Sequence, residues 1–271
     1  MPRLGQRGMA GAAVRVVGAR VCQQAGKHGC INRPGVRSRL SGRRCRMSMG
    51  TLSLVRPRTW VLPGVYRPQE DTRLLLRALY REGVRAGTEL LDLGSGSGAL
   101  AVGAARRGAR VTAVDICWQA VLATRVNAWL SRQRLTVRRG DLTAAVRGRS
   151  FDMLVSNPPY VPAPENQAPR GPARAWDAGR NGRLLVDRIC DAAPRVLRPG
   201  GVLLMVHSGL CGAEDTLEQL TSAGLRATVS DRAVIPFGPI LRSRLAWLRC
   251  QGLLDEVQDT EELVIIRAEN S

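Results

Sequence analysis

The strongest constraint on the fold of this chain is a regular alternation of strand-like and helical segments that begins at residue 69. Strand-like apolar runs are predicted at 88–93, 110–116, 135–142, 151–156, 202–208, 226–234 and 262–268. Helical segments are predicted at 69–84, 99–109, 118–133, 182–201, 212–225 and 240–253. Such alternation favours an α/β fold, in which helices cover both faces of a mostly parallel sheet.

The positive charge of the chain, +19 in total, is unevenly distributed. Residues 1–69 contain 14 of the 41 basic residues and no acidic residue, so the remainder is only mildly basic. Specific nucleic-acid binding therefore does not follow from the total. We expect 1–49 to be a basic, disordered extension, with an upstream translated region or an organelle-targeting segment as alternatives. Residues 50–271 are expected to form the folded domain.

The cysteines and the hydropathy pattern bear on compartment and metal binding. The seven cysteines include no CxxC pair, which favours a reducing compartment and a cytoplasmic location. Cys117 and Cys190 lie in apolar helical segments, where small buried thiols are expected. The set Cys22, His28, Cys30 and Cys45 fits no standard zinc spacing, so we expect no metal site. No run of 18 apolar residues is present, and we expect no membrane association.

A glycine turn, "LLDLGSGSG" at 90–98, joins the first predicted strand to a helix. Gly94, Gly96 and Gly98 allow a tight turn and the close approach of a ligand to the backbone. Asp115 ends the next strand, where a carboxylate can accept hydrogen bonds from both hydroxyls of a ribose. The alternative is that the glycines only form the turn and that Asp115 only caps a helix. The pattern favours a nucleotide-like ligand.

The charges around the turn favour S-adenosylmethionine over a dinucleotide. The spacing is G-x-G-x-G, not the dinucleotide pattern G-x-G-x-x-G. Asp92 stands two residues before Gly94 and would repel a pyrophosphate, whereas a ligand with an ammonium group suits it. Asp141 ends the third strand, where a carboxylate can accept from an adenine amino group, and Leu142 can pack on the ring. The cofactor predicted from these residues is S-adenosylmethionine.

The fourth strand ends in "NPPY", Asn157 to Tyr160. The two prolines fix the backbone, so that the Pro158 carbonyl and the Asn157 side chain offer two rigid acceptors for a planar NH₂ group. Tyr160 supplies a face for stacking, and Pro159 completes the substrate-binding segment. The alternative is that the prolines only terminate the strand and that the motif has no catalytic role. In this sequence order the motif predicts methylation of an amino or amide nitrogen, with Asn157, Pro158 and Tyr160 as catalytic residues.

Two further stretches narrow the family. "VYRPQEDTRLLLRAL" at 65–79 and "AWDAGRNGRLLVDR" at 175–188 resemble segments of the HemK-related class I S-adenosylmethionine-dependent methyltransferases, in the short form of these release-factor glutamine N5-methyltransferases. The resemblance covers about 60–210. It implies a Rossmann-like, seven-stranded, mostly parallel sheet with an antiparallel strand near the C-terminus. It also implies that contacts to the cofactor or the target amide come from Tyr66, Thr72, Asp92, Gly94, Asp115, Asp141 and Asn157.

The resemblance further implies a substrate and a partner. Family members methylate the glutamine of the Gly-Gly-Gln loop of translation release factors, and some work with a small zinc-binding activator subunit. An exposed apolar surface near the first strand would indicate such a subunit. A nucleic-acid amino methyltransferase, acting on adenine N6 or guanine N2, and a protein-lysine methyltransferase are the alternative functions.

The sequence departs from the family pattern in a few places. Arg67 and Arg73 replace an acidic and an apolar residue at the rim of the expected cleft, and Ala178 stands where glycine is usual. The region 232–257 is longer than in the minimal short form. It is expected either to recognise the substrate, because it carries several arginines and Trp247, or to cover the sheet edge as an amphipathic helix.

Overall fold

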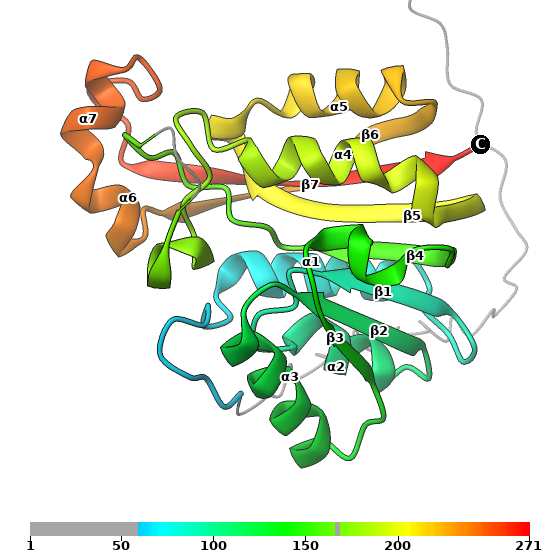
Figure 1. The fold of residues 1–271 in the computed structure, drawn as a ribbon. Coiled ribbons are helices and arrows are strands. Elements are labelled where there is room, and N and C mark those ends of the chain that lie inside the picture. The colour runs from blue at the N-terminus through cyan, green and yellow to red at the C-terminus, as the bar shows by residue number, and fades with distance from the viewer. Residues whose placement is uncertain (1–58, 166–168) are drawn as a thin grey trace, which may run out of the picture. The chain divides into compact units, whose positions relative to one another are not determined.

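The computed structural model describes residues 59–165 and 169–271, and the predicted extension 1–49 and its cysteines lie outside this part. Seven strands form one sheet in the order β3–β2–β1–β4–β5–β7–β6 (Figure 1). All neighbours run parallel except β7, which is antiparallel to both β5 and β6. The predicted sheet and its antiparallel strand are confirmed. The strands are β1 Glu89–Leu93, β2 Arg110–Asp115, β3 Thr136–Arg139, β4 Phe151–Ser156, β5 Leu197–Ser208, β6 Leu225–Pro236 and β7 Thr260–Asn270.

Helices cover both faces of the sheet. One apolar cluster joins Leu75 and Leu79 of α1 and Leu100 of α2 to one face, and a second joins Ile189 of α4 and Leu220 of α5 to the other. Helices α4 and α5 lie side by side there (Figure 1). The α-helices are α1 Glu70–Arg81, α2 Ala99–Ala105, α3 Trp118–Leu130, α4 Leu184–Val196, α5 Ala213–Ser222, α6 Pro239–Ser243 and α7 Leu245–Cys250, with 3-10 turns η1 Leu142–Val146, η2 Gly171–Ala175 and η3 Gly209–Cys211.

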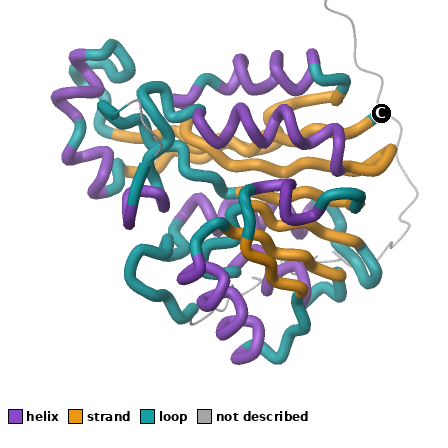
Figure 2. Tube along the Cα trace, viewed as in Figure 1, coloured by secondary structure: helices purple, strands orange, loops and turns teal. Residues whose placement is uncertain are grey.

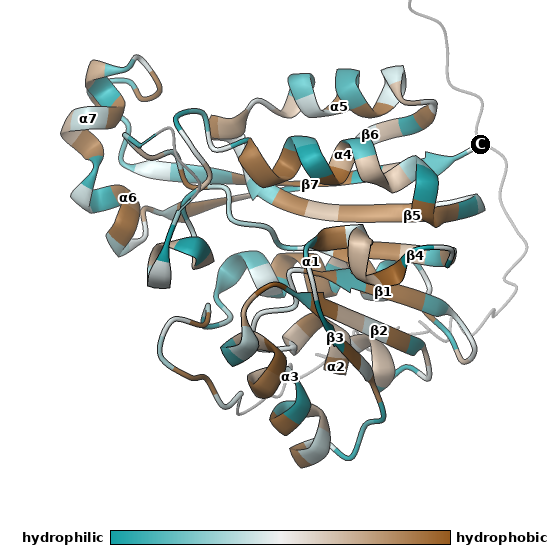
Figure 3. Cartoon of the chain, viewed as in Figure 1, coloured by the Kyte–Doolittle hydropathy of each residue, from teal (hydrophilic) through white to brown (hydrophobic). Residues whose placement is uncertain are grey.

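The central strands are apolar along most of their length, as expected for strands covered on both faces (Figure 3). β4 and the second half of β5 are almost entirely buried. Among its described residues, the segment between β4 and α4 is mostly loop, with only η2 as regular structure (Figure 2). This loop follows the NPPY motif and lies against the site described below.

The region 232–257 does not form the expected edge-covering helix, and its expected role in substrate recognition stays a prediction. Residues up to Pro236 extend β6, and α6 and α7 follow at the end of the β6–β7 pair. The two short helices enclose a small apolar cluster of their own, against which Val161 packs. Arg244 ion-pairs with Asp177 at 2.6 Å and donates to the Pro162 carbonyl at 2.9 Å. The insert therefore braces the loop after NPPY and does not cover the sheet edge.

In the described part of the chain, none of the helices has the length and apolar character needed to cross a membrane. The same part contains no cluster of three or more potential metal-binding side chains.

Candidate functional site

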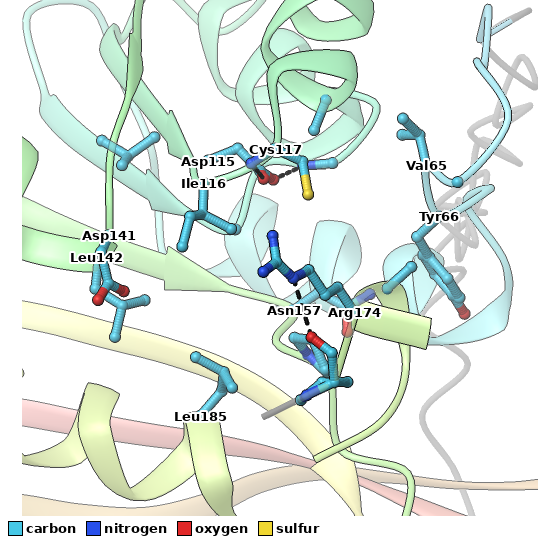
Figure 4. A pocket seen from close by; sticks show the side chains of 18 of the residues that line it. Val65, Tyr66, Asp115, Ile116, Cys117, Asp141, Leu142, Asn157, Arg174 and Leu185 are labelled. Atoms are coloured by element: carbon cyan, nitrogen blue, oxygen red, sulfur yellow. Dashed lines mark hydrogen bonds between the residues drawn. The ribbon is translucent and has the colours of Figure 1, made fainter. Parts of the chain in front are cut away.

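A cavity of about 280 Å³ opens at the carboxyl ends of β1 to β4 (Figure 4). The strand order reverses between β1 and β4, because β2 and β3 lie on one side of β1 and the later strands on the other. Loops diverge at such a switch point and leave a crevice for a ligand. Eight predicted site residues line it: Tyr66, Gly94, Gly96, Asp115, Asp141, Leu142, Asn157 and Pro159. Thr72, Asp92, Gly98, Pro158 and Tyr160 lie outside its lining.

The glycine turn needs backbone conformations that other residues rarely adopt. Gly94, Gly96 and Gly98 have φ angles of 72°, 53° and 79°. A Cβ on Gly98 would stand 2.9 Å from Thr124 of α3, so this glycine allows helix and turn to meet. A Cβ on Gly94 would have nothing within 4 Å, which leaves open space on the cavity side. Gly98 therefore shapes the turn, while Gly94 and Gly96 line the cavity.

Asp115 holds the turn from the side of β2. Its Oδ2 accepts from the Gly96 amide at 2.9 Å, and its Oδ1 accepts from the Cys117 amide at 2.9 Å. Burial raises the pKa of Asp115, and these two amides partly offset that effect. A carboxylate fixed by amides at the cavity wall keeps further lone pairs for two ribose hydroxyls.

Asp92 lies beneath the turn and not on the cavity wall. Its side chain is fully buried; Oδ2 accepts from the Ala101 amide of α2 at 3.1 Å, and Oδ1 has no partner among the described residues. Burial raises the pKa of Asp92 to about 7. A direct contact between Asp92 and a ligand ammonium would therefore require the turn to change its conformation.

We predict that replacing Asp92 with Asn increases stability in a pH-dependent way. The pKa of Asp92 is raised in the folded state, so its stabilising effect is complete below about pH 4 and is lost as the pH rises to about 7. The variant should gain on the order of 2–4 kcal/mol over the wild type between these pH values. Urea unfolding at pH 4, 6 and 8 measures this; a gain that does not change with pH would contradict it.

The end of the cavity between β3 and α4 is apolar with one polar wall (Figure 4). Leu142, Ile116, Leu184 and Leu185 line it, and Asp141 stands beside them. Arg188 of α4 pairs with Asp141 at 2.7 Å. A flat heterocycle with an amino group fits between apolar side chains and a carboxylate. This end suits the adenine of S-adenosylmethionine.

Asp71 connects the NPPY motif to helix α1. This carboxylate is 3% exposed, and its Oδ2 accepts from Asn157 Nδ2 at 3.0 Å, from Tyr66 at 2.7 Å and from Tyr160 at 3.1 Å. Because a carboxylate only accepts, this network orients the Nδ2 of Asn157 toward Asp71 and leaves Oδ1 without a hydrogen-bond partner among the described residues. Asn157 Nδ2 also donates to Thr72 Oγ1 at 3.3 Å. Asp71, Thr72 and the two tyrosines therefore fix the amide of Asn157.

The tyrosines of this network remain hydrogen-bond donors. Burial raises the pKa of Tyr66 and of Tyr160, and the nearby Asp71 raises both further. Tyr160 is 9% exposed and packs in the core beneath the motif. Its ring is therefore not placed to stack on a substrate group in this structure, whereas Pro159 reaches the cavity.

Sequence reasoning missed four residues of the site. Asp71 lies in the "QEDT" part of the stretch at 65–79 that carries the family resemblance, but it was not among the residues expected at the site. Cys117 was expected to be buried, but it is partly exposed at the cavity because it lies between the end of β2 and the start of α3. Arg174 and Arg188 line the cavity from the loop after NPPY and from α4. Arg188 ends the stretch at 175–188 that carries the resemblance but was not predicted as a site residue, and no pattern marked Arg174.

Comparisons with known proteins agree with this geometry. Residues 59–169 match the family model described as the methyltransferase small domain. A Methanocaldococcus jannaschii protein, named among protein N5-glutamine methyltransferases, is 33% identical over 66% of this chain and 90% of its own length. Mouse methyltransferase HEMK2 is 36% identical over 61% of this chain and 82% of its own length.

Bacterial and structural relatives complete the comparison. The release factor glutamine methyltransferase of Geobacter sulfurreducens is 34% identical over 60% of this chain, and the match spans 60% of that relative. The solved structure of E. cuniculi Mtq2 in complex with Trm112, described as responsible for methylation of the termination factor eRF1, is 25% identical. It has a TM-score of 0.56 and covers 77% of this chain and 99% of that chain.

Proposed function

The chain belongs to the HemK-related class I S-adenosylmethionine-dependent methyltransferases, and from that premise we propose that it methylates the side-chain amide of a glutamine in a translation release factor. The observation that carries the proposal is the free Oδ1 of Asn157 at the cavity, fixed by the Asp71 network. A cytoplasmic location, where release factors act, is part of the proposal.

The described residues suit the cofactor of this family. In this proposal Asp115, at the cavity wall, accepts from the ribose, and Asp141 and Leu142, which also line the cavity, bind the adenine. When bound, S-adenosylmethionine supplies an electrophilic methyl group on a sulfonium. Gly94 and Gly96 leave room beside the turn for the methionine end.

Asn157 and Pro158 perform the orienting step. Asn157 Oδ1 and the Pro158 carbonyl accept the two N–H groups of the target amide, so that the nitrogen lone pair faces the methyl group. With the cofactor bound, the nitrogen would form its bond to the methyl carbon as the carbon–sulfur bond breaks, and it would then release one proton to water. An amide nitrogen is a weak nucleophile, and orientation together with electrostatic polarisation must supply most of the rate.

A methyl-transfer assay on a release factor tests this function. The purified chain is incubated with labelled S-adenosylmethionine and a recombinant release factor that contains a Gly-Gly-Gln loop, with a Gly-Gly-Asn variant as the matched control. We expect a gain of one methyl group on the glutamine, and none on the control, by mass spectrometry. Label on lysine, or label in RNA or DNA that resists protease, would instead support one of the two alternative functions.

We further propose that a small zinc-binding activator, the counterpart of Trm112 in the Mtq2 complex, docks beside β3. Four of the exposed large apolar side chains of the described residues lie on α3, whereas β1 is a central strand. Trp118, Leu122 and Trp129 follow one stripe of this helix, and Trp129 is 77% exposed. β3 is the edge strand of the described sheet beside α3, and its outer edge pairs with no other described strand, so it can accept a strand of a partner.

We predict that Trp129→Asp weakens activator binding at least tenfold, because a charge replaces a large apolar contact. The measurement is the affinity of each variant for a co-purified Trm112-like protein, determined by titration. Val257→Asp provides the control, since Val257 is also highly exposed but lies in the segment before β7. Equal affinities of the two variants would place the partner elsewhere.

A further inference from the structure

Two arginines line the cofactor cavity, and their partners differ. Arg188 forms an ion pair with Asp141 at 2.7 Å. Arg174 donates only its Nε, to the Pro169 carbonyl at 3.0 Å, and forms no ion pair within the described part of the chain. The two terminal nitrogens of the Arg174 guanidinium are therefore available to a ligand.

The loop that carries Arg174 is fixed at its base. Val161 and Asp177 form a parallel bridge, and the Ala163 amide donates to the Gly179 carbonyl at 2.9 Å. The ion pair of Arg244 with Asp177 braces the same base from the insert. Figure 4 shows the guanidinium inside the cavity, between the Asp115–Cys117 wall and Asn157. The positive charge thus stands on the path between the ribose site and the acceptor site.

The charges of the cofactor decide what this cation can bind. Asp115 and Asp141 stand on the adenosine side, and Asp92 is buried beneath the turn. S-adenosylmethionine has one anionic group, the α-carboxylate of its methionine end, and a guanidinium is the side chain best suited to bind a carboxylate through two parallel hydrogen bonds.

We propose that Arg174 binds the α-carboxylate of the cofactor and so ties the loop after NPPY to the occupied cofactor site. The inference rests on the family cofactor and deepens the proposed function, but it does not depend on which acceptor is methylated. Arg174 is therefore a cofactor-specificity residue supplied by the loop that borders the acceptor site.

Calorimetry with two cofactor probes tests this contact without an acceptor. S-adenosylmethionine carries the carboxylate, and decarboxylated S-adenosylmethionine lacks only that group. We expect Arg174→Gln to weaken binding of S-adenosylmethionine about tenfold, the effect of losing one charge-assisted contact at a partly exposed site. Binding of the decarboxylated probe should be unchanged.

Arg180→Gln is the matched control, because Arg180 is exposed on the same loop and lies outside the cavity lining. It should leave both affinities unchanged. The proposal is overturned if Arg174→Gln weakens both probes equally, which would indicate a distorted loop, or weakens neither. It is also overturned if only the KM for the release factor rises, which would assign Arg174 to the acceptor. A failed glutamine assay with intact cofactor discrimination would reject the proposed acceptor alone.

Discussion

Replacing Asn157 with Ala should lower kcat for methyl transfer by about 10²–10³-fold. The side chain provides one of the two acceptors that orient the target NH₂ group, and its Oδ1 is free only because Asp71 and Thr72 hold its Nδ2. Removing a preorganised polar group of this kind affects the transition state more than the fold. Single-turnover assays with saturating cofactor and release factor measure the effect.

The control for Asn157→Ala is Asn181→Ala, an exposed asparagine of the following loop that does not line the cavity. Asn181→Ala should retain the wild-type rate. Thermal unfolding of both variants excludes a folding defect. If Asn157→Ala kept more than a tenth of the wild-type kcat, the orienting role of its amide would be rejected.

Replacing Gly182 with Ala should lower the free energy of unfolding by about 3 kcal/mol or more, and should also reduce methyl transfer. Gly182 has a φ angle of 72°, and a Cβ there would stand 2.4 Å from the Tyr160 carbonyl oxygen and 2.8 Å from Cys211 Sγ. The left-handed conformation costs alanine about 1–2 kcal/mol, and overpacking adds about 1–3 kcal/mol. Because the obstructing atom belongs to the backbone of the NPPY motif, relief of the clash displaces that motif.

Gly179→Ala separates the clash from the backbone strain. Gly179 has a similar φ angle, 76°, but the nearest atom to a Cβ there is 3.9 Å away. It should lose only about 1–2 kcal/mol. Urea unfolding of both variants tests the difference. Two losses that agree within about 0.5 kcal/mol would show that the contact with Tyr160 is not responsible.

The sequence determined the fold class and which site residues stand at the ends of the strands. Strands that are apolar on both faces and amphipathic helices in alternation admit few architectures other than a covered, mostly parallel sheet. The carboxyl ends of parallel strands meet at one edge, which brings the glycine turn, Asp115, Asp141 and Asn157 to one cavity. These residues follow strands directly, so their positions depend on local structure that a pattern can predict.

The tertiary structure alone decided how the site is supported. Asp71 and Asn157 are 86 positions apart, and their contact depends on how α1 packs onto β5 and α2. The place of Asp92 beneath the turn, of Tyr160 in the core and of Arg174 in the cavity depends on side-chain packing between distant segments. Periodicity and motif spacing describe local geometry and carry no information about such contacts, because packing fixes them only when the whole domain folds.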